Sequence, residues 1–272
     1  MCLILLVSIR TAMRDALLDM IEGLKRGDLW VSLGWHDVKQ RYRRSTLGPF
    51  WITLATLIMV SGMTLVYAGL FRQELAAFLP LVASGLVIWG FISGCISEGV
   101  NVFIGASSTI KQVPAPLTIH VFRLVWTQFI YFLHNIVIIV LAIVITGIPV
   151  TPVMLLAFPA LLLLIANLTW MCLLLGAIGA RFRDVPLIVQ SFMAALFMIT
   201  PVLWQPSFLP PDRRWVAFLN PFTYLVEILR APLLGTVPPF SIWVIALIMA
   251  FAGCICAAVL YGRSRTQIAF WV

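Results

Sequence analysis

The chain has 272 residues, of which 62% are hydrophobic and only 10% carry a charge, and its mean hydropathy is +1.07. A soluble domain carries about 25% charged residues, so the composition excludes an ordinary soluble protein and predicts an integral membrane protein. The net charge of +8 then bears on orientation in the membrane, and no nucleic-acid partner is expected. The five cysteines lie in apolar surroundings without metal-ligand spacing, so we expect neither a disulfide framework nor a metal site.

Residues 1–49 are expected to form cytoplasmic amphipathic helices at the membrane surface. Residues 11–26 place their apolar side chains on one helical face, with Asp19 among the charged residues elsewhere. Gly27 should break this helix, and Asp28 should cap a second one that lies in the headgroup plane. The apolar stripe of the second helix comprises Trp30, Leu33, Val38 and Tyr42. The opposing cationic face comprises Lys39, Arg43 and Arg44. A generic basic anchor is the simpler alternative to a functional role.

Six membrane spans are predicted from the stretches that hold no Asp, Glu, Lys or Arg. A spanning helix needs about 20 apolar residues, and the charge-free stretch of 57 residues from Leu124 to Ala180 is too long for one helix. It contains Thr146-Gly-Ile-Pro-Val-Thr-Pro152, a helix-breaking turn that divides it into two spans. We therefore predict an all-α transmembrane domain at residues 50–261, followed by a cytoplasmic tail at 262–272. Its spans are expected at about 50–70, 77–97, 122–146, 153–180, 186–204 and 241–261.

The basic residues predict the orientation of these spans. With both termini in the cytoplasm, fourteen of the eighteen arginines and lysines fall inside, and only Arg72, Arg213, Arg214 and Arg230 fall outside. Positive charge concentrates in cytoplasmic loops, so we expect both termini to be cytoplasmic.

The sequence lacks the residues that several classes of membrane protein require. There is no Gly-Lys dipeptide, so the chain has no Walker A phosphate loop and no ATP site of its own. The interiors of the predicted spans contain no Asp, Glu, Lys or Arg, which disfavours a proton- or ion-coupled carrier. An intramembrane enzyme is disfavoured because no catalytic constellation is visible. A transport subunit that binds no cofactor and takes its energy from a partner remains.

Two loops could connect such a subunit to its partner and to its exit. The inward loop Ile110–Arg123 has two prolines in a short turn and could dock into a cytosolic motor, although an ordinary connector is the simpler interpretation. The outward segment 205–236 is half apolar but rich in proline, so we expect short re-entrant helices in the outer leaflet. In that segment, Asn220 and Pro221 should begin a helix, and Glu227 and Arg230 are spaced to pair.

Four motifs resemble one known family, the ABC-2 type membrane subunits of bacterial polysaccharide exporters, especially those for lipopolysaccharide O-antigen. The motif "WHDVKQRYRRSTLGPFW" (Trp35–Trp51) is close to the signature Arg-Asp-x-x-x-Arg-Tyr…Leu-Gly-Pro-x-Trp that opens the family's transmembrane domain, with His36 where the family often has Arg. The others are "LNPFTYLVEILR" (Leu219–Arg230), "RFRDVP" (Arg181–Pro186) and the tail "RSRTQIAFWV". The resemblance covers nearly the whole chain.

The resemblance implies a homodimer in the bacterial inner membrane with two copies of a separate ABC ATPase subunit, which uses ATP and Mg. It also implies export of an undecaprenyl-diphosphate-linked glycan. We assign substrate uptake to Trp30, Arg41, Tyr42, Arg43, Arg44 and Trp51, because arginines bind phosphate and aromatic rings stack on sugars. Contact with the ATPase is assigned to Lys111, Gln112, Pro114, Ala115 and Pro116, and a periplasmic gate to Asn220, Pro221, Glu227 and Arg230. An exporter of another glycolipid, of a capsule or teichoic-type polymer or of a drug is the alternative.

Overall fold

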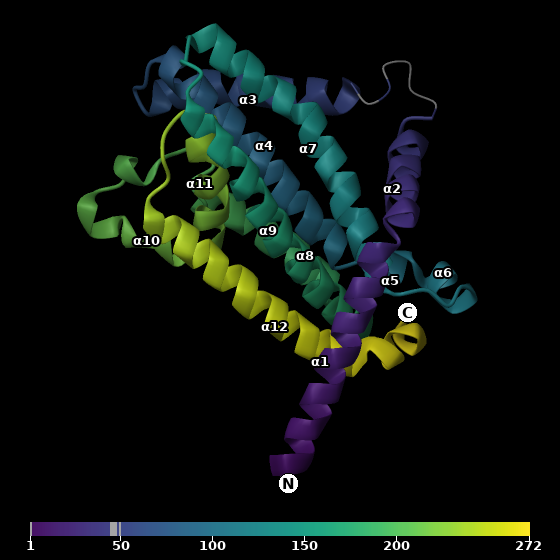
Figure 1. The fold of residues 1–272 in the computed structure, drawn as a ribbon. Coiled ribbons are helices and arrows are strands. Elements are labelled where there is room, and N and C mark those ends of the chain that lie inside the picture. The colour runs from purple at the N-terminus through teal and green to yellow at the C-terminus, as the bar shows by residue number, and fades with distance from the viewer. Residues whose placement is uncertain (1, 44–47, 49) are drawn as a thin grey trace.

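The protein is a bundle of helices (Figure 1). The computed structural model describes residues 2–43, 48 and 50–272, with side chains from Met13 onward. Every regular element within these residues is a helix. The predicted all-α class is therefore confirmed for the described part of the chain.

Five of the described helices are long and apolar enough to cross a membrane. They are α3 (Phe50–Leu70), α4 (Leu75–Gly99), α7 (Thr118–Thr146), α8 (Ala157–Arg181), which follows the 3-10 helix η1 (Pro152–Leu156), and α12 (Phe240–Trp271). A further apolar helix, α9 (Val185–Ile199), has 15 residues. It is about 22 Å long at 1.5 Å per residue, which is short for a hydrocarbon core of about 30 Å. The span predicted at 186–204 thus corresponds to a helix that ends five residues earlier.

The break between α7 and α8 lies where the sequence predicts it. Gly147 follows the last residue of α7 with φ 69°, and Pro152 begins η1. Glycine adopts this left-handed conformation without the steric cost that a Cβ would add. The long apolar stretch is therefore two helices joined by a turn.

The two N-terminal helices differ in detail from the prediction. The first, α1 (Cys2–Lys25), begins well before residue 11, and α2 covers Gly27–Arg41. The predicted cap at Asp28 is wrong, because Arg26 occupies the N-cap position without a side-chain hydrogen bond and Asp28 lies in the first turn. A carboxylate there still interacts favourably with the helix dipole. Both helices pack on α7, and α1 also packs on α12.

The short helices lie at two ends of the bundle (Figure 1). One end, which we call the terminal end, holds α2, α5 (Val102–Gly105), α6 (Ser107–Gln112) and the last turn of α12. The opposite end holds η1, η2 (Pro206–Phe208), η3 (Pro211–Arg213), α10 (Trp215–Leu219) and α11 (Pro221–Leu233). Between them α4 is the most buried of the long helices and packs against α3, α7, α8, α9 and α11.

Candidate functional site

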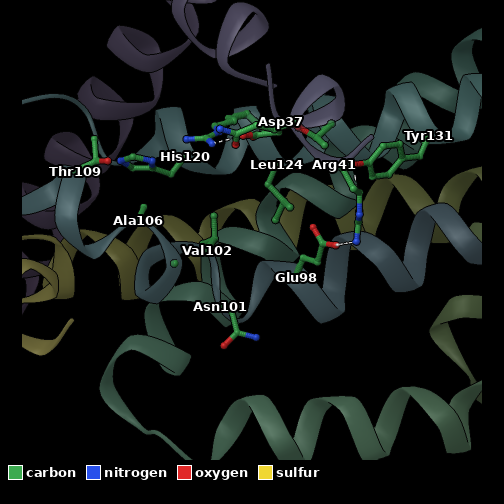
Figure 2. Close-up of a pocket in the computed structure, with 14 residues that line it drawn as sticks. Asp37, Arg41, Glu98, Asn101, Val102, Ala106, Thr109, His120, Leu124 and Tyr131 are labelled. Carbon is green, nitrogen blue, oxygen red and sulfur yellow. Dashed lines mark hydrogen bonds and ion pairs between the residues drawn. The ribbon is translucent and has the colours of Figure 1, made fainter. Parts of the chain in front are cut away.

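A polar cavity of about 700 Å³ lies at the terminal end, between α2, α4, α7 and the segment that holds α5 and α6. Figure 2 shows its side chains converging from these elements. The polar groups come from Asp37, Gln40, Arg41, Glu98, Asn101, Thr109, His120, Arg123, Thr127 and Tyr131. Acids, bases, amides and hydroxyls are thus mixed in one cavity.

Arg41, at the end of α2, reaches across this cavity to two other helices. Its Nη1 donates a hydrogen bond of 3.1 Å to the Tyr131 hydroxyl, and its guanidinium lies over the Tyr131 ring at 5.3 Å. Its Nη2 lies 3.7 Å from Glu98 Oε1 (Figure 2). The hydrogen bond to Tyr131 raises the pKa of Arg41 above its ordinary value, so the guanidinium stays charged.

A second ion pair crosses the same cavity. Arg123 Nε donates to Asp37 Oδ2 at 2.5 Å, and Arg123 Nη2 donates to Asp37 Oδ1, so that the pair is bidentate. Such a pair fixes two side chains in one plane. It fastens α2 to α7. With Arg41 and Glu98, the lining holds two guanidinium and two carboxylate groups, whose formal charges cancel.

The residues predicted for substrate uptake are only partly brought together. Arg41 lines the cavity, and the next residues are Tyr42, which is half-buried, and Arg43, which is exposed. Burial raises the pKa of Tyr42. Trp51 is 48% exposed at the start of α3 and is not part of the lining. Arg44 lies outside the described residues.

Trp30 is directed against protein rather than into this cavity. Its ring centroid lies 6.1 Å from that of Phe122 and 6.0 Å from that of Trp126, both on α7. Gly34, one turn further along α2, is buried against the same helix, where a Cβ would lie 2.8 Å from Trp126 Cδ1. The face of α2 that holds Trp30 and Gly34 therefore packs on α7.

The residues predicted to contact the ATPase lie on α6 and in the turn after it. Lys111, Gln112 and Pro114 are exposed, Ala115 is half-buried and Pro116 is buried. Lys111 Nζ donates to the main-chain carbonyl of Val272, and Arg183 Nη2 donates to that of Trp271 at 3.2 Å. One cation from α6 and one from the turn between α8 and α9 thus hold the end of α12, because cations near a helix C-terminus are favourable.

The Asp19 carboxylate, which the amphipathic pattern predicts on the polar side of the first helix, is buried and joins three helices. Asp19 is 1% exposed. Its Oδ2 accepts hydrogen bonds from Thr118 N at 3.1 Å, Thr118 Oγ1 at 2.9 Å and Tyr261 OH at 2.7 Å. Arg265 Nε lies 3.2 Å from Oδ1. The position of Asp19 between Ala16 and Gly23, two small residues at helical spacing, was a usable signal for close packing.

At the opposite end, α11 has the start and the ion pair that its sequence predicts. Asn220 Oδ1 accepts a hydrogen bond of 3.0 Å from Phe222 N, and its Nδ2 donates to Thr200 Oγ1 at 2.8 Å. Pro221 is the first residue of α11, where a missing N–H costs nothing.

The α11 ion pair is buried on the arginine side. Arg230 is 2% exposed and donates to Glu227 Oε2, from Nε at 3.0 Å and also from Nη2. Its Nη1 donates to the carbonyl of Pro201 at 2.7 Å. Since Pro201 follows α9, the guanidinium fastens α11 to the end of that helix.

Comparison with known proteins places the chain among membrane transporters. A sequence profile of the family described as ABC-2 type transporter matches residues 28–234. The chain is also similar to proteins named O-antigen export system permease protein RfbA. For the one from Klebsiella pneumoniae the identity is 22% over 202 residues, which cover 73% of this chain and 77% of that protein. For the one from Myxococcus xanthus it is 27% over 207 residues, covering 75% and 79%.

Proposed function

Because the chain belongs to the ABC-2 type transporter family, we propose that it is the membrane subunit of an ATP-driven exporter of O-antigen polysaccharide in the bacterial inner membrane. The names of its relatives support the cargo, and its five long apolar helices suit a multi-pass membrane protein. We propose that the cargo is linked to undecaprenyl diphosphate and moves from the cytoplasm to the periplasm. The observation that carries this assignment at the residue level is the cavity around Arg41.

Arg41 is the residue that we assign to the diphosphate. A guanidinium group can bind phosphate with two parallel hydrogen bonds. Because Glu98 already lies 3.7 Å from Arg41, an arriving diphosphate must replace that carboxylate. Binding is therefore an exchange of one anion for another, and it would release α2 from the end of α4.

The rest of the lining suits a glycan. Sugar hydroxyls need both donors and acceptors, which the Asn101 amide, the Thr127 hydroxyl and the cavity carboxylates supply. The ring of Tyr131 offers a face for stacking. In this proposal Tyr42 lies at the rim, beside Arg41. Trp30, Arg43 and Trp51 are no longer assigned to the uptake site, because none of them lines the cavity.

The energy for transport would come from two copies of a separate ABC ATPase, which bind ATP and Mg, acting on a homodimer of this chain. We propose that the ATPase contacts α6 and the turn at Lys111, Gln112 and Pro114, because their side chains are exposed at the terminal end. Ala115 and Pro116 would shape this turn from within. This arrangement requires the terminal end to face the cytoplasm, in line with the excess of basic residues predicted there.

The opposite end would carry the exit. We propose that α10 and α11 are re-entrant in the outer leaflet, that α9 and the residues after it complete a sixth span, and that α11 is a gate. The hydrogen bonds from Asn220 to Thr200 and from Arg230 to Pro201 support this, because they tie α11 to the end of α9. Movement of one element would then require movement of the other.

Export measured in cells tests the uptake site. Arg41→Gln, in cells whose own copy of the gene is deleted, should lower the amount of O-antigen at the cell surface about tenfold or more, because a charge-assisted hydrogen bond is worth roughly 1.5–3 kcal/mol. Glu98→Gln should leave export intact, since it frees Arg41 for the phosphate.

The matched control is Arg43→Gln, which removes the same charge from an exposed residue two positions further along. It should export normally. Equal losses in the Arg41 and Arg43 variants, with both proteins correctly inserted and assembled, would show that these arginines only anchor the helix at the membrane. Normal export by Arg41→Gln would refute the assignment of the cavity around Arg41 as the uptake site.

A further inference from the structure

A narrow surface of α4 continues the polar cavity towards the opposite end of the bundle. It begins at Glu98, which lines the cavity and faces Arg41 (Figure 2). From there it follows one side of the helix through Ser97, Gly94, Ser93 and Gly90. Glu98 and Gly90 are exposed and the three residues between them are half-buried, whereas every other residue of Trp89–Gly99 is buried. We call these five residues, from Gly90 to Glu98, the α4 track.

Gln128 of α7 lies on the track, and its amide is unpaired. A Cβ at Gly94 would overlap Gln128 Oε1, so the two residues are in close contact. Gln128 is 5% exposed and makes no hydrogen bond with the part of the chain that the structure describes. Buried amides are nearly always paired. Neither side-chain amide atom of Gln128 is completely covered, so a molecule in the track can reach it.

Lipid hydrocarbon is a poor occupant of the track. Both α4 and α7 are candidate membrane spans, and Ser93 lies about two turns inside the end of α4 at Gly99. Ser93 Oγ donates only to the carbonyl of Gly90 on its own helix, at 3.4 Å. An amide or a hydroxyl that enters hydrocarbon loses its hydrogen bonds with water and gains none. The track therefore favours an occupant that carries hydroxyl or amide groups.

A second copy of the chain is also disfavoured as the occupant. Gly90 and Gly94 have the G-x-x-x-G spacing at which spanning helices pack closely. Gly94 is already covered by Gln128 of the same chain, however, so the close approach at this glycine is used within the bundle. Gly90, where a Cβ would have no neighbour within 4 Å, is open. The track adjoins the cavity that we assign to the lipid-linked glycan, and this continuity indicates what enters it.

We propose that the α4 track binds the sugar chain of the exported glycan and that Gln128 holds its hydroxyl groups. This inference rests on the proposed function. A sugar presents donors and acceptors together, and a side-chain amide can pair with both. Glycine lets a bulky sugar ring approach the helix closely. Since Glu98 is the only charged residue of the track, the diphosphate would stay with Arg41 while the sugar units enter.

The reactivity of introduced cysteines tests the track. Ser93→Cys and Ser97→Cys are made in the full chain with Cys2→Ser, and cells express this chain together with its ATPase. Inverted membrane vesicles are treated with a charged methanethiosulfonate, which reacts with thiols in contact with water. Both introduced cysteines should react, and they should react roughly threefold or more slowly in vesicles from cells that make the glycan, as expected for a site that is mostly occupied. Cys254 and Cys256, exposed on α12, face hydrocarbon and should stay unmodified.

Two substitutions test the residues that form the site. Gln128→Leu should lower export and weaken the protection of the cysteines by roughly two- to tenfold, the factor for one neutral hydrogen bond. It should not lower the melting temperature, because the amide has no partner to lose among the described residues. Gln267→Leu makes the same change at an exposed position of α12 and should affect neither export nor protection. Gly90→Leu should block export by projecting into the track, whereas Ala252→Leu adds bulk at an exposed position of α12 and should not.

The outcomes separate the track from the uptake site. Loss of export by Arg41→Gln without any protection of the two cysteines would overturn the track and leave the uptake site in place. Protection of the cysteines with normal export by Arg41→Gln would do the reverse. Unreactive cysteines, or a disulfide between two copies of the Ser93→Cys chain, would overturn the track because hydrocarbon or protein would then cover it. A melting temperature of Gln128→Leu that falls in step with export would make Gln128 a packing residue.

Discussion

Replacement of Asp19 should release α1 from the bundle. In the protein its carboxylate accepts three hydrogen bonds from Thr118 and Tyr261 and lies 3.2 Å from Arg265 Nε. Asp19→Ala removes the acceptor and leaves the Tyr261 hydroxyl, on a residue that is 0% exposed, without its partner. Asp19→Asn keeps the shape but removes the charge.

The loss in free energy of unfolding that each substitution causes can be worked out from these contacts. A hydrogen bond to a charged acceptor contributes about 1.5–3 kcal/mol and a neutral one about 0.5–1.5 kcal/mol, so each of three bonds weakens by about 1 kcal/mol in Asp19→Asn. We therefore expect a loss of about 2–3 kcal/mol for Asp19→Asn. Asp19→Ala leaves two buried donors, Thr118 N and the Tyr261 hydroxyl, without an acceptor. Each unpaired buried donor costs about 1–3 kcal/mol, so we expect a loss of about 2–6 kcal/mol for Asp19→Ala. Tyr261→Phe, which removes one bond to the charged acceptor, should cost about 1.5–3 kcal/mol.

Hydrogen exchange measured by mass spectrometry on the purified protein distinguishes local release from global unfolding. Amides in Met13–Lys25 should exchange faster in Asp19→Ala, while those in α4 keep their protection. A double-mutant cycle between Asp19 and Tyr261 should show a coupling energy of about 1 kcal/mol. Unchanged exchange in Met13–Lys25, or strictly additive effects of the two substitutions, would refute the view that this carboxylate holds α1 in place.

Two further substitutions probe other contacts. Glu227→Ala should lower the melting temperature and reduce export, because it leaves the buried Arg230 without its carboxylate, at a cost of about 3–5 kcal/mol. Swapping the two side chains, Glu227→Arg with Arg230→Glu, should restore at most part of the function, since Arg230 also donates to the carbonyl of Pro201. Full activity of Glu227→Ala would mean that α11 is static. Gly34→Ala should destabilise the packing of α2 on α7 by about 1–3 kcal/mol, whereas Gly27→Ala, whose Cβ would have its nearest neighbour at 3.8 Å, should cost less. Equal melting temperatures for the two alanine variants would contradict the close approach.

The long apolar helices could be predicted because hydrocarbon imposes a simple rule on sequence. A span excludes charges over about 20 residues, so the helix Phe50–Leu70 was predicted with its correct ends. Local signals also sufficed for the N-cap at Asn220 and the pair of Glu227 with Arg230, because their partners lie within a few residues.

The polar contacts at the terminal end could not be predicted in this way. The amphipathic pattern of the first helix predicts that Asp19 is solvent-exposed. The side chain is in fact buried by partners such as Tyr261, which lies 242 positions away in the sequence. Arg41 is 90 positions from Tyr131. Which side chains meet depends on how helices from distant segments pack, and periodicity within one segment carries no information about that. The same limit explains why Trp30 was assigned to the uptake site rather than to the packing of α2 on α7.

The uninterrupted length of α12 has a mechanical consequence. Its 32 residues make a rod of about 48 Å at 1.5 Å per residue, longer than the hydrocarbon core of about 30 Å. At the terminal end, Tyr261 and Arg265 bind α1, and Arg183 holds the last turn. Nearer the opposite end, the carbonyl of Ala246 accepts a hydrogen bond of 3.2 Å from Asn167 on α8. A continuous helix resists shortening along its axis. If α1 or the loop that carries Arg183 is displaced, α12 must therefore tilt or slide along its axis where it lies beside α11. The side chains between the two ends need not change their partners for this movement to be transmitted.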